Sequence, residues 1–373
     1  MSAPPLPVTV WMNMPSFYQT DLLGELAVHP GVDLRVHFAR GVSAERLGLG
    51  WSAGTAGLPA DVLHGSVARA LAIARRERER VHVVGGLWSE PAFSAVLAYL
   101  RARGSRCVVY AEAFDPRVAR SAWKRGLKNA FGRWIAGRAA LLPVAGLGER
   151  LYAPLGFDPV YPFAYFRRAI VEPQRRRAGA RVAFAGQLVE RKGLDLLIRA
   201  LAPLAPEFPD MTLTVIGDGP QREDLVRLAA GSPVVFAGVV PSGEMPARLA
   251  EMDLLVLPSR FDGWGLVVNE ALMVGTPAIV SDQCGAAELI RSGENGWAFA
   301  SEDVDALRAR LRTFLSLSEA DKLRLRAGAA ASSRGVGVKE AADYLVECLG
   351  HLTGRRAAPP SPPWRLAAIR PPL

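Results

Sequence analysis

Short apolar runs alternate with helical spacings along most of the chain. In the first half, apolar or alternating runs predict strands at residues 8–11, 33–38, 81–84 and 107–110. Apolar residues that recur every three or four positions predict helices at 19–28 and 91–101. Buried parallel strands read as short continuous apolar runs, because helices cover both faces of their sheet. The first half is therefore predicted to be a parallel α/β domain.

The second half repeats this alternation more regularly. Strands are predicted at 181–186, 212–217, 234–238, 254–257 and 278–281, and helices at 194–201, 220–230, 245–252 and 266–273. Strands that alternate with helices predict a doubly wound sheet, whose ligands bind outside the carboxyl ends of the strands. We therefore expect an α/β protein with two Rossmann-like doubly wound domains facing a cleft.

Composition shifts predict the domain boundaries, since a chain of 373 residues is expected to form two domains. We expect an N-terminal domain at 1–166, a basic linker without apolar periodicity at 167–180, and a second domain at 181–335. A C-terminal helix at 336–357 is expected to pack back on the N-terminal domain. The proline-rich end at 358–373 is predicted to be disordered.

The composition is that of a soluble globular protein, with 50% hydrophobic and 22% charged residues. The three cysteines, Cys107, Cys284 and Cys348, are far apart and form no CxxC pair. This favours a reducing compartment over a disulfide framework or a zinc site. The N-terminus lacks the basic flank and apolar core of a signal peptide, and no run approaches the roughly 18 apolar residues of a membrane span. We expect a cytoplasmic protein.

The net charge of +9 is concentrated in one region, because residues 101–138 hold ten basic residues against Glu112 and Asp115. Such a patch favours an anionic partner, such as a lipid headgroup, a phosphorylated acceptor or nucleic acid. Nucleic acid is disfavoured because no base-stacking motif is interleaved with the cations.

Within this patch, five large apolar residues share one helical face: Trp123, Leu127, Phe131, Trp134 and Ile135. Most cations fall elsewhere on the helix: Lys124, Arg125, Lys128 and Arg133. The pattern fits a helix on an anionic membrane surface, from Trp123 to Arg138, and equally a domain helix that buries its apolar face in the core.

The strongest chemical signal lies at 259–277, where Asp262 and Glu270 flank Gly263 and Gly265 at the start of a predicted helix. Amide groups at a helix N-terminus bind anions, and glycines let a ligand approach the backbone closely. Because a carboxylate would repel phosphate, we expect Asp262 to face sugar hydroxyls and Glu270 to accept hydrogen bonds from a ribose diol. The alternative is that Asp262 only caps the helix and Glu270 is a solvated or interhelix carboxylate.

A second signal follows the strand that ends at Gly186, where Arg191 and Lys192 precede the next helix. Two cations in a strand-to-helix loop suit a diphosphate, although a solvated charged turn is the alternative. Gly217 is a weaker signal, because a GxG sequence is usually a tight turn. Beyond the next strand, Val239 and Val240 could offer backbone groups to a base edge.

In this order and spacing, the segments resemble group 1, family 4 glycosyltransferases, which have the two-Rossmann GT-B fold. The resemblance is close from residue 181 to about 296 and looser from 8 to 163. It implies that Asp262 contacts the donor sugar, that Glu270 contacts the ribose and that Lys192 contacts the phosphate. The full set of donor phosphate-binding residues that we expect is Gln187, Arg191, Lys192, Gly263, Trp264, Gly265, Leu266 and Val267. For the ribose and base we expect Glu270, Gly217, Val239 and Val240.

This chain departs from the family pattern at two of these positions. Asp262 stands where the family usually has glutamate, and Gln187 stands where arginine is frequent, so Arg191 is expected to supply that charge. The glycine-rich loop often found after the first strand is also missing. These departures leave the donor sugar open.

The resemblance implies a retaining hexosyltransferase that uses a nucleotide-diphosphate sugar and needs neither a cofactor nor a metal. The acceptor is expected to be a glycan or a lipid-linked glycan of cell-surface polysaccharide or glycolipid synthesis, with the enzyme on the inner face of the membrane. Asp262 and, on the acceptor side, Glu112 are the candidate catalytic residues, and Glu112 has the alternative of being an ordinary loop residue. Other candidates are a GT-B epimerase or phosphorylase and a non-enzymatic basic protein that binds carbohydrate or nucleic acid.

Overall fold

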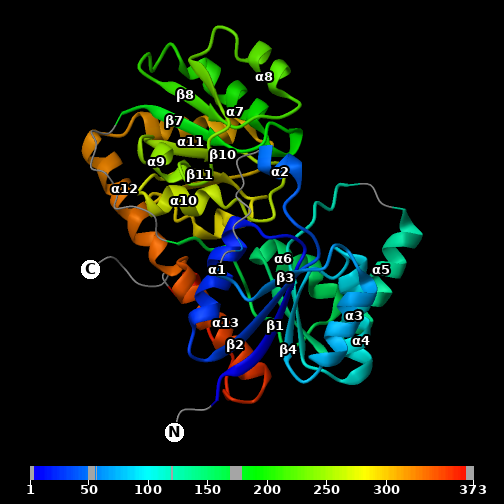
Figure 1. Cartoon of the computed structure of the whole chain (residues 1–373). Coiled ribbons are helices and arrows are strands. Elements are labelled where there is room, and N and C mark those ends of the chain that lie inside the picture. The colour runs from blue at the N-terminus through cyan, green and yellow to red at the C-terminus, as the bar shows by residue number, and fades with distance from the viewer. Residues whose placement is uncertain (1–3, 49–54, 56, 119–120, 169–178, 367–373) are drawn as a thin grey trace. The chain divides into compact units, whose positions relative to one another are not determined.

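The computed structural model describes residues 4–48, 55, 57–118, 121–168 and 179–366, and it divides into two compact units (Figure 1). Unit 1 holds Met1–Leu47, Ser52–Arg167 and Val338–Pro363. Unit 2 holds Gly48–Trp51, Arg168–Gly337 and Trp364–Leu373. Each unit contains a six-stranded parallel sheet with helices between its strands, so the prediction of two Rossmann-like α/β domains is confirmed.

The sheet of unit 1 has the order β3-β2-β1-β4-β5-β6. Its strands are β1 (Leu6–Met12), β2 (Val32–Phe38), β3 (Ala60–Val62), β4 (Val81–Gly85), β5 (Cys107–Ala111) and β6 (Ala139–Pro143). The helices are α1 (Phe17–Val28), α2 (Ala44–Gly48), α3 (Val67–Arg76), α4 (Pro91–Arg103), α5 (Ala122–Ala136), α6 (Ala145–Tyr152), η1 (Ala153–Leu155) and α13 (Val338–Leu352).

The sheet of unit 2 has the order β12-β11-β10-β7-β8-β9. Its strands are β7 (Arg181–Ala185), β8 (Thr212–Ile216), β9 (Val234–Gly238), β10 (Leu254–Leu257), β11 (Ala278–Ser281) and β12 (Gly296–Phe299). The α-helices are α7 (Leu194–Leu201), α8 (Arg222–Leu228), α9 (Met245–Ala250), α10 (Val267–Met273), α11 (Val304–Leu315), α12 (Glu319–Ser332) and α14 (Pro363–Leu366). The 3₁₀ helices are η2 (Glu190–Lys192), η3 (Ala202–Leu204), η4 (Gly285–Leu289) and η5 (Ser333–Gly335).

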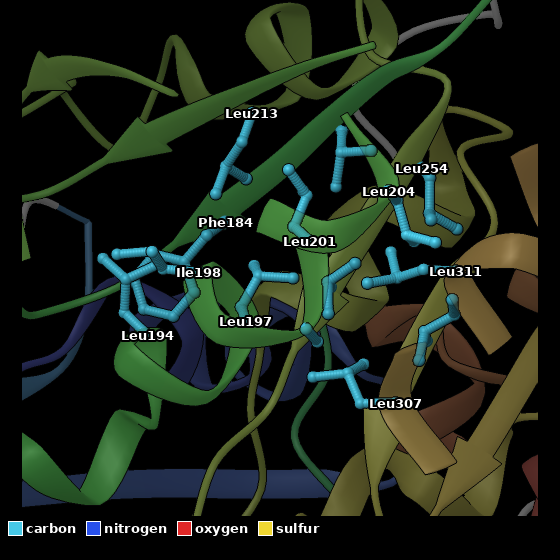
Figure 2. Packing of buried hydrophobic residues seen from close by; sticks show 14 of the residues in the cluster. Phe184, Leu194, Leu197, Ile198, Leu201, Leu204, Leu213, Leu254, Leu307 and Leu311 are labelled. Carbon is cyan, nitrogen blue, oxygen red and sulfur yellow. The ribbon is translucent and has the colours of Figure 1, made fainter. Parts of the chain in front are cut away.

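Helix α7 shows how the apolar pattern builds the core of unit 2. Its apolar residues recur at the three- and four-residue spacing of one helical face: Leu194, Leu197, Ile198 and Leu201. Figure 2 shows these side chains beside Phe184 of β7 and Leu213 of β8, with Leu307 and Leu311 of α11 in the same cluster. Each fully buried side chain of this size contributes roughly 1.5–3 kcal/mol. The core thus fixes α7, and with it the loop that joins β7 to α7.

The apolar pattern missed three strands, β3, β6 and β12. Strand β3 has only three half-buried residues, so it carries no alternation. Strand β6 follows α5 after only Gly137 and Arg138, so its apolar run merges with the end of the helix. Strand β12 has four residues and begins at a glycine. Short strands at or near a sheet end leave too few positions for a period to appear.

The C-terminal part of the chain joins unit 1 through α13. Tyr344 donates a hydrogen bond to the Pro162 carbonyl (2.9 Å), and Tyr161 hydrogen bonds to His351 Nδ1 (2.7 Å). The expectation of a disordered tail is wrong for residues 358–366, because α14 forms there and buries Trp364. Residues 367–373 and the linker residues 169–178 lie outside the described part of the chain.

Among the described residues, no helix combines the length and the apolar character that crossing a membrane requires.

Candidate functional site

The strand order of unit 2 reverses between β7 and β10. From β7, the chain moves outward through β8 to β9, then returns to the other side of β7 and continues through β10, β11 and β12. In doubly wound sheets, ligands bind outside the carboxyl ends of the strands at such a reversal. The two strongest sequence motifs follow these two strands, since Lys192 comes after β7 and Asp262 comes after β10.

Lys192 and Asp262 meet at this point as an ion pair. The Lys192 ammonium donates a hydrogen bond to Asp262 Oδ2, although the two residues are 70 positions apart. Both side chains are largely shielded from water, at 13% and 11% exposure. A shielded cation beside the amides of a glycine-rich turn is suited to an anionic ligand, which would compete with Asp262 for Lys192. The alternative of a solvated charged turn is wrong for Lys192, whereas Arg191 beside it is exposed.

Backbone hydrogen bonds hold the Asp262 segment against the loop after β11. The Asp262 amide donates to the Gln283 carbonyl (2.9 Å), and the Gly285 amide donates to the Asp262 carbonyl (3.1 Å). Asp262 does not cap α10, because the N-cap position is Leu266. The capping alternative for Asp262 is therefore wrong.

Gly265 closes the turn in a conformation that favours glycine, with φ of +91°. A Cβ atom there would lie 2.6 Å from Cys284 Sγ and 2.7 Å from Leu257 Cδ2. Burial, reinforced by the charge of Asp262, raises the pKa of the Cys284 thiol well above its ordinary value. The neutral thiol donates to the Trp264 carbonyl (2.8 Å), so Cys284 is part of the packing beneath the turn.

Trp264 and Glu270 are both buried, at 0% and 5% exposure. The Trp264 indole donates to Asn269 Oδ1 (2.8 Å), which ties the turn to the first residues of α10. The Trp264 side chain is therefore a packing anchor, and only its backbone amide is available for the phosphate role expected from the sequence. Leu266 and Val267 are half-buried at the start of α10. The low exposure of Glu270 excludes the solvated-carboxylate alternative.

The loops after β7 and β8 lie against each other through glycines. Gly217 has φ of +132°, and a Cβ atom there would lie 2.0 Å from the Gly186 carbonyl oxygen. The Leu188 amide donates to the Asp218 carbonyl across the same contact (2.9 Å). Close backbone approach therefore explains the glycine at position 217. Gln187 is half-buried in this contact region.

Val239 and Val240 follow β9, the edge strand beyond β8. The Gly217 amide donates to the Gly238 carbonyl (2.7 Å), which joins the ends of β8 and β9. The expected residues therefore form a row along the carboxyl edge of the sheet, from Asp262 through Lys192 and Gly217 to Val239.

Arg260 belongs to the site, but the sequence reasoning did not single it out. Its guanidinium binds both carboxylate oxygens of Asp195 (2.8 and 2.7 Å) and donates to the Glu190 carbonyl (2.8 Å). Burial alone would raise the pKa of Asp195, but the Arg260 hydrogen bonds and charge outweigh it and hold the pKa below its ordinary value. Arg260 thus joins the loop that carries Lys192 to the loop that carries Asp262. The sequence offered one signal for this role, since Arg260 lies two residues before Asp262. The pairing with Asp195 could not be read from the sequence, because 65 positions separate the two residues.

In unit 1, the strand order reverses between β1 and β4, and a cavity of about 250 Å³ lies at these strand ends. Glu112 lines it, directly after β5. The Tyr165 hydroxyl donates to Glu112 Oε2 (2.8 Å), and the Tyr152 hydroxyl donates to the Glu112 carbonyl (3.0 Å). Burial first, and then the charge of Glu112, raises the pKa of Tyr165 well above 10, so its hydroxyl stays protonated. Glu112 is therefore a cavity residue held by two tyrosines.

Comparisons with known proteins place unit 2 in a family. Residues 168–334 match the family model described as glycosyl transferases group 1. The GDP-mannose-dependent alpha-(1-6)-phosphatidylinositol monomannoside mannosyltransferase of Mycolicibacterium smegmatis is 35% identical over 146 residues, which are 36% of this chain and 38% of that protein. The 2-deoxystreptamine glucosyltransferase of Streptomyces kanamyceticus is 28% identical over 306 residues, 74% of this chain and 78% of that protein. For the first relatives, the match thus spans only about two fifths of their length, 38% and 44% in two cases.

The architecture of both units together has solved counterparts. Anabaena Alr3699/HepE, crystallised in complex with UDP, has a TM-score of 0.71 at 15% identity, over 92% of this chain and 99% of that one. At this identity the likeness shows the fold alone, which is GT-B. The family match over unit 2, the GT-B likeness and the motifs around Lys192 and Asp262 together support the resemblance of this chain to the group 1 glycosyltransferases.

Proposed function

We propose that the protein is a retaining glycosyltransferase that moves a sugar from a nucleotide-diphosphate donor to a glycan or lipid-linked acceptor. The synthesis of a cell-surface polysaccharide or glycolipid is the proposed setting. The observation that carries this proposal is the shielded Lys192–Asp262 pair at the β7/β10 reversal of unit 2.

The donor is proposed to lie along the carboxyl edge of the unit 2 sheet. Lys192, with Arg191 and Gln187 nearby in the chain, would hold the diphosphate together with the backbone amides of residues 263–267. Asp262 would accept hydrogen bonds from the sugar hydroxyls, and Glu270 from the ribose. The base would lie toward Val239 and Val240. Solved structural neighbours bind UDP or UDP-glucose, and the Mycolicibacterium relative is named for GDP-mannose, which supports a nucleoside diphosphate sugar as the donor.

In the proposed reaction, the bond between the anomeric carbon and the diphosphate breaks, and the new bond forms to an acceptor hydroxyl. The departing diphosphate gains negative charge, which Lys192 and the amides of the glycine turn are positioned to stabilise. We propose that this stabilisation needs no metal. Retention of the anomeric configuration is carried over from the group 1 family.

The acceptor is proposed to enter the cavity of unit 1. Glu112 is positioned there to accept a hydrogen bond from an acceptor hydroxyl, because the two tyrosine hydroxyls orient it. Asn13 and Ser89 line the same cavity and can bind further hydroxyls.

We also propose that the protein is cytoplasmic and attaches to the inner face of the membrane through α5. Three of the five apolar residues predicted on its face are exposed: Trp123 at 65%, Leu127 at 63% and Trp134 at 45%. At about 100° per residue, these three residues, hereafter the α5 stripe, fall on one narrow side of the helix. Phe131 packs against the core and Ile135 is buried, so the core-helix alternative describes the C-terminal part of α5, from Phe131 onward. Co-sedimentation with anionic vesicles tests this attachment, and no binding at low salt would contradict it.

A panel of nucleotide sugars tests the central proposal. We expect one donor to be hydrolysed slowly to free nucleoside diphosphate and sugar, and Glu270→Gln to abolish that hydrolysis. Proton NMR of the transferred product is expected to show the anomeric configuration of the donor. Release of a sugar 1-phosphate that requires added phosphate would indicate a phosphorylase instead. Conversion to an epimeric nucleotide sugar, without release of diphosphate, would indicate an epimerase.

A further inference from the structure

One helix, α5, contacts the unit 1 cavity and also carries the exposed α5 stripe. Lys128 lines the cavity, with its ammonium 5.7 Å from the centroid of the Trp88 ring. One turn earlier, Lys124 is exposed beside Trp123 (5.5 Å) and lies outside the cavity lining. The same helix therefore presents a cation to a pocket and large apolar side chains to solvent.

The lining of the cavity combines aromatic rings with polar side chains. The rings of Trp88 and Tyr152 are nearly parallel, at 29° and 6.1 Å, and Phe114 meets Trp88 edge-on (70°, 6.2 Å). Such rings are complementary to the apolar C–H face of a ring polyol, whose hydroxyls can turn toward Asn13 and Glu112. The lining therefore favours a sugar or cyclitol ring.

Two buried polar atoms of the lining need a partner. Gln19 Oε1 and Trp88 Nε1 are buried and make no hydrogen bond within the described part of the chain. Buried polar groups are nearly always hydrogen bonded, so each such atom requires an explanation. The lining thus holds one acceptor and one donor without a hydrogen-bond partner. After small side-chain adjustments, the hydroxyls of a ligand could bind both.

The size of the cavity limits the ligand to about one ring. Its volume of about 250 Å³ lies just below the usual range of ligand pockets, roughly 300 to 1,000 Å³. A chain of several sugars would extend beyond it.

The charges of the cavity give the ligand a direction. Among the described residues that line it, Lys128 is the only cation and Glu112 the only anion. An anionic group attached to the ring is therefore drawn to the α5 side and repelled from the Glu112 side. The α5 stripe lies on the same helix as Lys128, about 100–140° around the helix axis from it. An apolar chain attached to that anionic group could therefore reach the stripe by passing around one side of α5.

We infer that the unit 1 cavity holds the polyol headgroup of an anionic lipid, with its phosphate at Lys128 and its apolar chains in the bilayer that the α5 stripe contacts. This inference rests on the proposed glycosyl transfer, in which such a lipid is the acceptor. Of the two acceptor classes proposed above, this inference favours a polyol phosphate lipid in the membrane over a soluble glycan.

Vesicle binding by the full chain tests the inference. The vesicles contain phosphatidylcholine with an equal fraction of phosphatidylinositol, which has a ring polyol phosphate, or of phosphatidylserine, which has the same net charge and no ring. We expect at least about fivefold tighter binding to the phosphatidylinositol vesicles. Equal affinities would overturn the headgroup assignment. Binding of soluble inositol 1-phosphate as tight as binding of the vesicles would overturn the lipid assignment in favour of a soluble acceptor.

Matched variants of α5 separate the cavity from the surface. Lys128→Gln is expected to remove the preference for phosphatidylinositol, and Lys128→Arg is expected to restore most of it. Lys124→Gln and Trp123→Ala are expected to weaken binding to both anionic vesicles by the same factor and to leave the preference intact. Identical behaviour of Lys128→Gln and Lys124→Gln would overturn the role of Lys128.

Nucleotide binding without lipid distinguishes the two proposals, because it depends on unit 2. A wild-type chain that binds a nucleoside diphosphate but does not prefer phosphatidylinositol would overturn this inference and leave the proposed function standing. A chain that prefers phosphatidylinositol but neither binds a nucleoside diphosphate nor hydrolyses any nucleotide sugar would overturn the proposed function.

Discussion

The two units share one strand order, yet the reversal points of their sheets carry different chemistry. In each unit the first strand is central, with the second strand on one side and the fourth on the other. At the reversal of unit 2 the loops carry an ion pair and closely packed glycines. At the reversal of unit 1 a cavity is lined by aromatic rings, one carboxylate and one lysine, which α5 contributes. The fold supplies the position of a site, whereas the loop residues decide what it binds.

The backbone differs as much as the side chains. In unit 2, hydrogen bonds join the loop after β7 to the loop after β8 and to the loop after β10. This arrangement brings backbone amides together, where they can bind a phosphate. It leaves little room for a side chain at the glycines of these loops. In unit 1, a cavity of about 250 Å³ lies between the corresponding loops, with room for a ring. The following changes test that contrast, from the largest expected effect to the smallest.

Gly217→Ala tests whether close backbone contact is essential in unit 2. The new Cβ would lie 2.0 Å from the Gly186 carbonyl oxygen, so the two loops must separate. Strain and overpacking together are expected to lower the free energy of unfolding by about 3 kcal/mol, measured by urea denaturation. Gly231→Ala is the matched control, because its φ is also positive (+77°) but a Cβ there meets nothing within 4 Å. Equal losses in both variants would contradict the packing role of Gly217.

Arg260→Gln tests the clamp between the Lys192 and Asp262 loops. It leaves Asp195 without its bidentate partner and is expected to lower the free energy of unfolding by about 1–3 kcal/mol at neutral pH. Arg312→Gln breaks a bidentate pair with Glu207 that is exposed, and it should change stability little.

The acid dependence of this effect follows from Asp195. Arg260 holds the folded pKa of Asp195 below its ordinary value of 3.8. The stability of the pair is therefore fully present above that value and is lost as the pH falls through the lower folded pKa. The difference between wild type and Arg260→Gln should shrink in acid. A difference that grows in acid would contradict this account.

Tyr165→Phe tests the unit 1 site with the smallest change. It removes the hydroxyl that donates to Glu112 Oε2, a hydrogen bond expected to contribute about 1 kcal/mol. We expect severalfold weaker binding to phosphatidylinositol vesicles and unchanged nucleotide affinity. Tyr161→Phe is the control, since its hydroxyl binds His351 in the same unit and Tyr161 does not line the cavity. A loss of nucleotide affinity in Tyr165→Phe would show that the two sites are not chemically separate.

The sequence predicted the sheets well, because buried parallel strands are apolar runs that need no partner to be recognised. The motifs around Lys192 and Asp262 were also visible, since each follows a predicted strand directly. Their meeting at one reversal point depends on strand order, which no local pattern contains.

Other features depended on contacts between distant residues. Arg260 binds Asp195 across 65 positions, and the tyrosines that hold Glu112 lie 40 and 53 positions from it. The sequence did not show that the Trp264 side chain is buried, because Trp264 lies among the motif residues that were expected to bind the donor phosphate. For α5 the apolar face was visible, but which of its residues met the core and which met solvent depended on contacts with distant parts of unit 1.

Calorimetric titration of UDP and GDP into the full chain tests the central claim, that Lys192, which pairs with Asp262 in the ligand-free site, holds the donor diphosphate. We expect one of the nucleotides to bind the wild type, and Lys192→Gln to weaken that binding by about 10- to 100-fold, the loss of one charge-assisted hydrogen bond. Asp262→Asn, which frees Lys192 from its ion pair, is expected to tighten binding severalfold, and Arg199→Gln on the exposed side of α7 to leave it unchanged. An unchanged affinity in Lys192→Gln would contradict the account.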